Sequence, residues 1–124
     1  MTVDEFTHHL TDLDGERISA IATALRSELD TAEGEVAWWR ATIAVSGTLR
    51  RHHLTREASL AAHAASTALV SAAERAGTNS RDVTTVARAA AEVARVLVAG
   101  RPVPMPSAVA DPLLHAWHDV VDAA

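Results

Sequence analysis

The residues best suited to chemistry in this chain form a short basic cluster. Arg50, Arg51, His52 and His53 are consecutive, and Arg56 follows three positions later. Guanidinium and imidazolium groups at this density can hold a phosphate, a nucleotide or a nucleic-acid backbone. The same residue types are also favoured at a helix C-terminus, beside the negative end of the helix dipole. Arg50, Arg51, His53 and Arg56 are therefore candidate anion ligands, while the net charge of −5 argues against duplex nucleic acid.

A second group of candidate ligands lies near the C-terminus. His115 and His118 are three positions apart, and Asp122 follows His118 by four. Imidazole and carboxylate groups at helical spacing can share a zinc or similar divalent ion. The outer side of a helix carries polar residues in any case, and the sequence supplies no residues to orient such ligands. His115, His118 and Asp122 are candidate metal ligands, but we expect no cofactor.

A carboxylate–histidine centre inside the fold is a weaker hypothesis. Ferritin-like bundles place a Glu on each of two helices and a Glu-x-x-His motif on each of the other two. This chain contains a single Glu-x-x-His, from Glu5 to His8, where such a bundle needs two. Helical phase also predicts that His63 and Glu92 face solvent, away from the other available groups, which are Glu35, His53 and Glu57.

Sequence patterns for nucleophilic catalysis are missing. The chain has no cysteine, which excludes disulfides, thiol nucleophiles and cysteine-bound metals. It also has neither Gly-x-Ser-x-Gly nor a glycine pattern that cradles phosphate. These absences favour a non-enzymatic protein.

Two adjacent tryptophans are the strongest candidates for a contact surface. Trp38 and Trp39 point about 100° apart on a helix, so one seam between helices cannot bury both. Each can pack against a different neighbour in the core. Alternatively, one of them forms an interaction surface with Arg40, since aromatic and arginine side chains dominate interface hot spots.

The composition predicts an all-α fold. Alanine, the best helix former, fills 27 of 124 positions, while aromatic residues make up 3% of the chain. The length suits one domain over 1–124. We expect a compact antiparallel bundle of four main helices, with a short C-terminal helix after a proline-rich strap.

Apolar periodicity and capping residues divide the chain into elements. The predicted helices are a short one over 3–11, four main ones over about 15–30, 32–52, 56–76 and 81–99, and a last one over 112–122. One kinked helix over 3–30 is the alternative at the start of the chain. Three prolines in 101–106 predict the extended strap.

Single residues mark several of these ends. Thr2 and Glu5 form a capping box, and Thr55 is placed to cap the helix over 56–76. Gly77 and Gly100 follow two predicted helix ends.

Three packing expectations follow from the helical faces. The helix over 32–52 has an apolar arc covering half its circumference and is expected to be central. The helix over 81–99 has a narrow polar stripe, on which Arg88 can pair with Glu92, and is expected to be the most enclosed. The alanine face of residues 58–73 is a possible surface for self-association.

Composition and charge also suggest a source and a location. All 11 basic residues are arginine, which is typical of a GC-rich bacterial genome. The first residues are acidic rather than basic and apolar, and no run approaches the ~20 apolar residues of a membrane span. We therefore expect a cytoplasmic protein without membrane contact.

Three functions remain, in order of preference. The first is a non-enzymatic interaction or regulatory module, binding a protein partner or a second copy as a homodimer. The second is a helical bundle that binds a metal or a small ligand. The third is binding of an anionic ligand or nucleic acid through Arg50 and Arg51.

Overall fold

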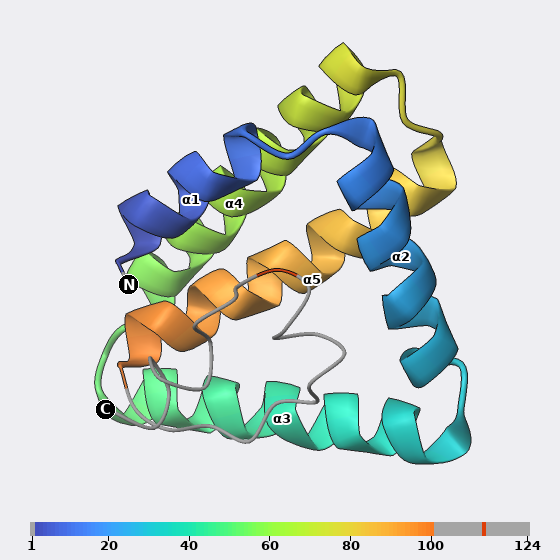
Figure 1. The fold of residues 1–124 in the computed structure, drawn as a ribbon. Coiled ribbons are helices and arrows are strands. Elements are labelled where there is room, and N and C mark those ends of the chain that lie inside the picture. Colours follow the sequence, from blue (N-terminus) through green and yellow to red (C-terminus); the bar gives the residue numbers. More distant parts are fainter. Residues whose placement is uncertain (1, 101–112, 114–124) are drawn as a thin grey trace.

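The computed structural model describes residues 2–100 and Leu113, and over 2–100 it contains five helices and no strand (Figure 1). The helices are α1 (Val3–Thr11), α2 (Gly15–Leu29), α3 (Ala32–Arg51), α4 (Thr55–Ala76) and α5 (Ser80–Ala99). The expected all-α class is confirmed for this part of the chain. The alternative of one kinked helix over 3–30 is wrong, because α1 and α2 are separate. The expected strap over 101–106 and helix over 112–122 lie outside the described residues, apart from Leu113.

Side chains cap four of the five helices. Thr2, Asp14, Thr31 and Asn79 each accept a hydrogen bond from the backbone N–H three residues later, at distances of 2.8 to 3.1 Å. Each cap satisfies an amide that has no partner within its own helix.

Helix α4 begins differently, and the expected Thr55 cap is wrong. Thr55 is the first residue of α4, and Leu54 occupies the cap position without a side-chain hydrogen bond. His53 adopts a left-handed backbone conformation with φ 57°. This turn lets the Leu54 amide donate to the Leu49 carbonyl at 2.8 Å, while the Leu54 carbonyl accepts from Ala58 at 2.9 Å. The backbone itself therefore closes the α3–α4 connection.

Helix α5 is the centre of the described fold, as its narrow polar stripe predicts. It packs most extensively on α4, then on α2, and also touches α1 and α3 (Figure 1). Buried alanines occur on both α4 and α5, and small side chains allow helix axes to approach closely. The larger core side chains that fill the remaining space include Phe6, Leu10, Ile18, Leu25, Leu49, Leu69, Val86, Val93 and Leu113.

The alanine face of residues 58–73 is part of this core. Ala58, Ala61 and Ala65 are at most 8% exposed, and α1 and α5 are the main neighbours of their helix. The expectation that this face is available for self-association is therefore wrong.

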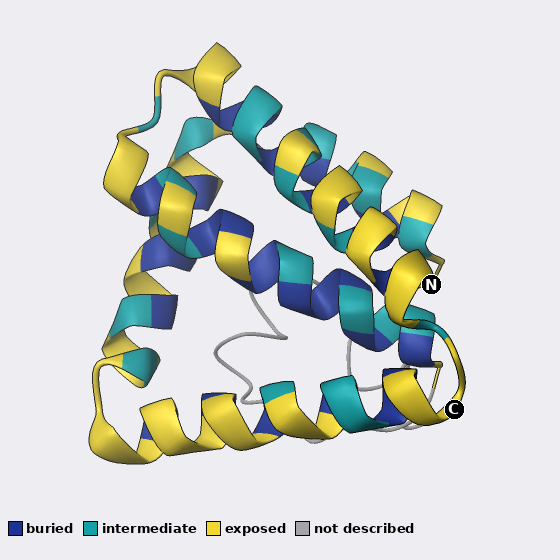
Figure 2. Cartoon of the chain, turned by 180° about the vertical axis from the view of Figure 1, so that it is seen from behind, coloured by how far each residue is buried: buried dark blue, intermediate teal, exposed yellow. Residues whose placement is uncertain are grey.

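Helix α3 is peripheral, not central as expected. In Figures 1 and 2 it runs along one edge of the molecule, and most of its length is exposed. Its contacts with α2, α4 and α5 are all limited. A broad apolar arc indicates more than one neighbour, but α5 and the alanine-rich face of α4 already supply most of the core. Part of the α3 arc consequently stays uncovered.

Candidate functional site

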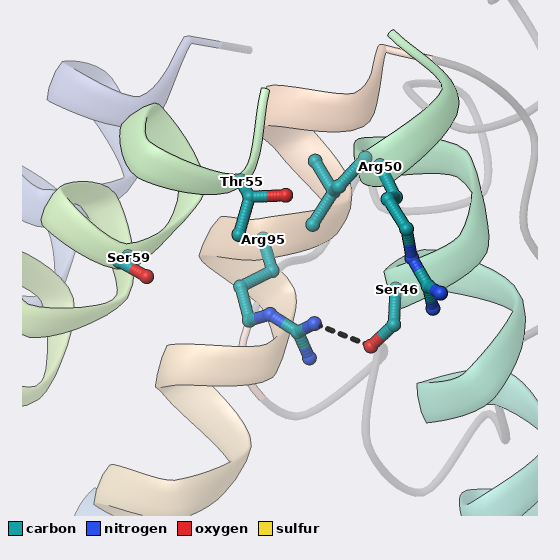
Figure 3. A pocket seen from close by; sticks show the side chains of 6 residues that line it. Ser46, Arg50, Thr55, Ser59 and Arg95 are labelled. Atoms are coloured by element: carbon teal, nitrogen blue, oxygen red, sulfur yellow. Dashed lines mark hydrogen bonds between the residues drawn. The ribbon is translucent and has the colours of Figure 1, made fainter. Parts of the chain in front are cut away.

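A polar pocket lies where α3, α4 and α5 approach one another (Figure 3). Its volume is about 200 Å³, and it is lined by Ser46, Leu49, Arg50, Thr55, Ser59 and Arg95. We call these six residues the α3–α5 pocket. Two guanidinium groups and three hydroxyls surround a space with a single large apolar side chain, which favours a polar ligand over an apolar one.

Arg95 is the most firmly held side chain in the pocket. Its Nη2 donates to Ser46 Oγ at 2.7 Å, and its Nη1 donates to both carboxylate oxygens of Glu92 at 2.7 and 3.0 Å. The side chains of Arg95 and Glu92 are 23% and 8% exposed. Hydrogen bonds to Ser46 and Glu92 thus hold the guanidinium in one orientation, and the Glu92 carboxylate offsets its charge.

The solvent-facing position expected for Glu92 is therefore wrong. Helix α5 is so enclosed that even its polar stripe is partly covered, and Arg95 supplies the compensating charge three residues away. The predicted pairing of Arg88 with Glu92 is wrong as well. The Arg88 guanidinium lies over the Trp38 ring instead, 5.7 Å from the ring centroid, within cation–π range.

The structure brings only one of the four predicted anion ligands into the pocket. Arg50 lines it, whereas Arg51 donates to Thr48 Oγ1 at 3.2 Å on its own helix. His53 and Arg56 are exposed and are not among the lining residues. The anion site predicted from the basic cluster stays a prediction, now with a different set of residues around Arg50.

The other pocket residues were missed by sequence reasoning, although part of their pattern was visible. Ser46 and Arg50 are four positions apart, as are Thr55 and Ser59, so each pair lies on one helix face. Sequence spacing gives no sign that these two faces meet. Nor does it bring Arg95, 49 positions from Ser46, to the same place.

The described residues contain no cluster of three or more His, Asp or Glu side chains suited to a metal ion. His63 is exposed on α4. The candidate metal ligands His115, His118 and Asp122 lie outside the described residues.

A second candidate site is an exposed apolar stripe on α3. Val36, Trp39 and Ile43 lie at positions i, i+3 and i+7, which share one helix face. They are 46%, 64% and 50% exposed, respectively. We call these three residues the α3 stripe. Arg40 is exposed beside it, whereas Trp38 is only 9% exposed, so the adjacent tryptophans differ sharply in burial.

The charges of α3 are separated along its length. Glu33 and Glu35 lie in its first turn, and Arg50 and Arg51 lie in its last turn. This arrangement complements the dipole of the helix. The α3 stripe lies between the acidic and the basic end.

A third cluster ties α2 to the start of α5. Arg26 donates to Asp82 at 2.7 Å, and Asn79 Nδ2 donates to the same carboxylate at 3.0 Å. The hydrogen bond from Arg26 is the main cause that lowers the pKa of Asp82 below its ordinary value of 3.8, against the opposing effect of burial. Every member has a partner within the cluster, so we assign it a structural role.

Comparison with family models, curated proteins and solved structures found no match for this chain. Among the described residues, no helix combines the length and the apolar character that a membrane span requires. The α3 stripe and the α3–α5 pocket are therefore the two candidate functional sites of the described residues.

Proposed function

We propose that this protein is a non-enzymatic interaction module that forms a homodimer through the α3 stripe. The observation that carries the proposal is the 64% exposure of Trp39, flanked by half-exposed Val36 and Ile43. Large contiguous apolar patches are rare on monomeric proteins and often mark interaction sites. Trp is also strongly enriched among residues that dominate binding energy.

A second copy of the chain suits this surface because α3 is self-complementary when two copies run antiparallel. A two-fold axis near Trp39 places Val36 of one copy opposite Ile43 of the other, so the apolar stripes cover each other. The acidic first turn of each α3 then approaches the basic last turn of the other. Symmetric dimers with such matched surfaces are the commonest oligomers.

The spacing along the helix supports this charge pairing. At 1.5 Å per residue, an axis between residues 39 and 40 leaves Glu33 about 6 Å along the axis from Arg50 of the second copy. An arginine side chain can span that offset. Arg40, beside the stripe, contributes to a polar rim around the apolar centre.

The dimer would give α3 the antiparallel helix neighbour that the sequence predicts for a bundle. The proposal also keeps the cytoplasmic location expected from the sequence. It requires neither a nucleic acid nor a membrane surface.

Analytical ultracentrifugation of the full chain tests the proposal. We expect a reversible dimer at micromolar concentration, with a dissociation constant raised tenfold or more by Trp39→Ala, since hot-spot truncations cost about 2 kcal/mol or more. Leu60→Ala is the matched control, because Leu60 is also 64% exposed but lies on α4. This variant should dimerise like the wild type.

Two results would overturn the proposal. The first is a wild-type chain that stays monomeric up to about 100 μM, a concentration at which an interface of ordinary affinity is populated. The second is a dimer that Trp39→Ala and Leu60→Ala weaken equally. High salt should also weaken the dimer, because the flanking charge pairs are exposed and screened.

A further inference from the structure

We propose that the α3–α5 pocket binds a phosphate group, either free or as the monoester of a small molecule. This inference goes beyond the proposed dimer and shares one residue with it, because Arg50 lines the pocket and also lies at the basic end of α3 that would approach Glu33 of the second copy. It begins from the convergence of Arg50 and Arg95, from two helices, on one pocket (Figure 3). Guanidinium groups match the geometry of phosphate oxygens and can donate two parallel hydrogen bonds.

The two arginines are suited to different tasks. Arg95 is held in place by Ser46 and Glu92, so its guanidinium is oriented before any ligand arrives. Arg50 is exposed at the edge of the pocket and has the freedom to close over a bound group. Preorganisation of one donor lowers the entropy cost of binding.

Hydroxyl groups complete the set of hydrogen-bond donors. Ser46 on α3 and Thr55 and Ser59 on α4 line the same space (Figure 3). Thr55 is the first residue of α4, whose N-terminus has no side-chain cap. Amide groups at an uncapped helix start add partial positive charge, although Glu57 in the same turn opposes it.

Charge and volume define the class of ligand. The two arginines exceed the nearby Glu92 by one positive charge, which favours an anion. A volume of about 200 Å³ holds several waters. It is smaller than the roughly 300–1,000 Å³ of pockets for drug-sized ligands. Phosphate with a few attached carbon atoms fits this description better than a whole nucleotide does.

An NMR titration of the ¹⁵N-labelled full chain tests the proposal. The chain is titrated with inorganic phosphate, and separately with glycerol 3-phosphate, at constant ionic strength. We expect saturable shifts of the Ser46, Thr55 and Ser59 amide signals. Arg50→Gln should weaken binding about tenfold, as expected for loss of a charge-assisted hydrogen bond. Arg51→Gln removes the same charge one residue away, from outside the pocket lining, and should change the affinity less than about twofold.

Ser46→Ala provides a second variant that removes the oriented hydroxyl without changing charge, and it should weaken binding severalfold.

Tighter binding of glycerol 3-phosphate than of inorganic phosphate would identify a monoester ligand, and the reverse order would identify free phosphate. Absence of saturable shifts below about 20 mM of either probe would overturn the proposal. Equal weakening by Arg50→Gln and Arg51→Gln would also overturn it, because it would indicate diffuse electrostatic attraction. The oligomeric state is measured separately, so failure here leaves the dimer proposal intact.

Discussion

Gly34 provides the sharpest test of the described packing, because it is a helical residue that should not tolerate a methyl group. It lies in the first turns of α3, is buried, and donates its amide to Thr31 Oγ1 at 2.9 Å. A Cβ built at Gly34 would overlap the carbonyl oxygen of Glu28 and lie 2.9 Å from both the Glu28 carbonyl carbon and Thr31 Oγ1. The obstructing groups are mainly backbone, so no side-chain rotation relieves the overlap.

Two opposing effects set the size of the loss in Gly34→Ala. Replacing a helical glycine by alanine normally stabilises a protein by about 0.5–1 kcal/mol. Overpacking typically costs about 1–3 kcal/mol, and an overlap with backbone falls at the upper end of that range. We therefore expect a net loss of about 1–2 kcal/mol, or a fall in Tm of several degrees for a domain of this size.

Gly47 is the matched control on the same helix. A Cβ there would meet only Arg51 Nη1, at 3.3 Å, and this is the flexible end of a side chain. Gly47→Ala should therefore raise the free energy of unfolding by about 0.5 kcal/mol or more. Urea unfolding followed by circular dichroism measures both variants at one protein concentration. A Gly34→Ala protein at least as stable as the wild type would refute the described corner between α2 and α3.

Two further predictions concern the core and the buried ion pair. Ala90→Leu should lower the free energy of unfolding by about 1–3 kcal/mol in urea, because Ala90 is fully buried on the most enclosed helix. An unchanged free energy of unfolding would mean that α5 is less enclosed than the described fold shows. Because the pKa of Asp82 is lowered in the folded protein, the unfolded chain binds more protons than the folded protein as pH falls below about 4. The stabilisation from the Arg26–Asp82 pair is therefore present above that pH and is lost below it. Asp82→Asn should thus destabilise the protein more at pH 6 than at pH 3, and equal urea midpoint shifts at the two pH values would contradict this.

The helices themselves were largely predictable because their signals are local. Thr2 accepts from the Glu5 amide as its capping box predicts, and the Asp14 cap separates α1 from α2. Gly77 and Gly100 follow helix ends with φ values of 69° and 62°, a conformation that favours glycine. Each of these features depends on residues only a few positions apart.

At Thr55 and Glu92 the structure differs from what the local sequence predicts. Thr55 is a suitable cap by residue type, but the turn at His53 lets backbone groups make the hydrogen bonds instead. Glu92 lies on a polar stripe, yet α5 touches four other helices, and the tertiary fold decides how much of that stripe is covered. The pocket was unpredictable for the same reason, since Arg95 reaches Ser46 only through the packing of α5 against α3.

The two candidate sites share α3 because it is the helix that the core uses least. Helix α5 is so enclosed that its two buried carboxylates, Asp82 and Glu92, are each paired with an arginine. Helix α3 buries Trp38 but leaves Trp39 exposed, and it leaves Arg50 free at the pocket edge. Side chains that the fold does not need for its own stability are the ones free to bind something else. Variants on α5 and on α3 should therefore have different effects. Ala90→Leu should change the free energy of unfolding, whereas Trp39→Ala should change dimerisation and Arg50→Gln should change phosphate binding.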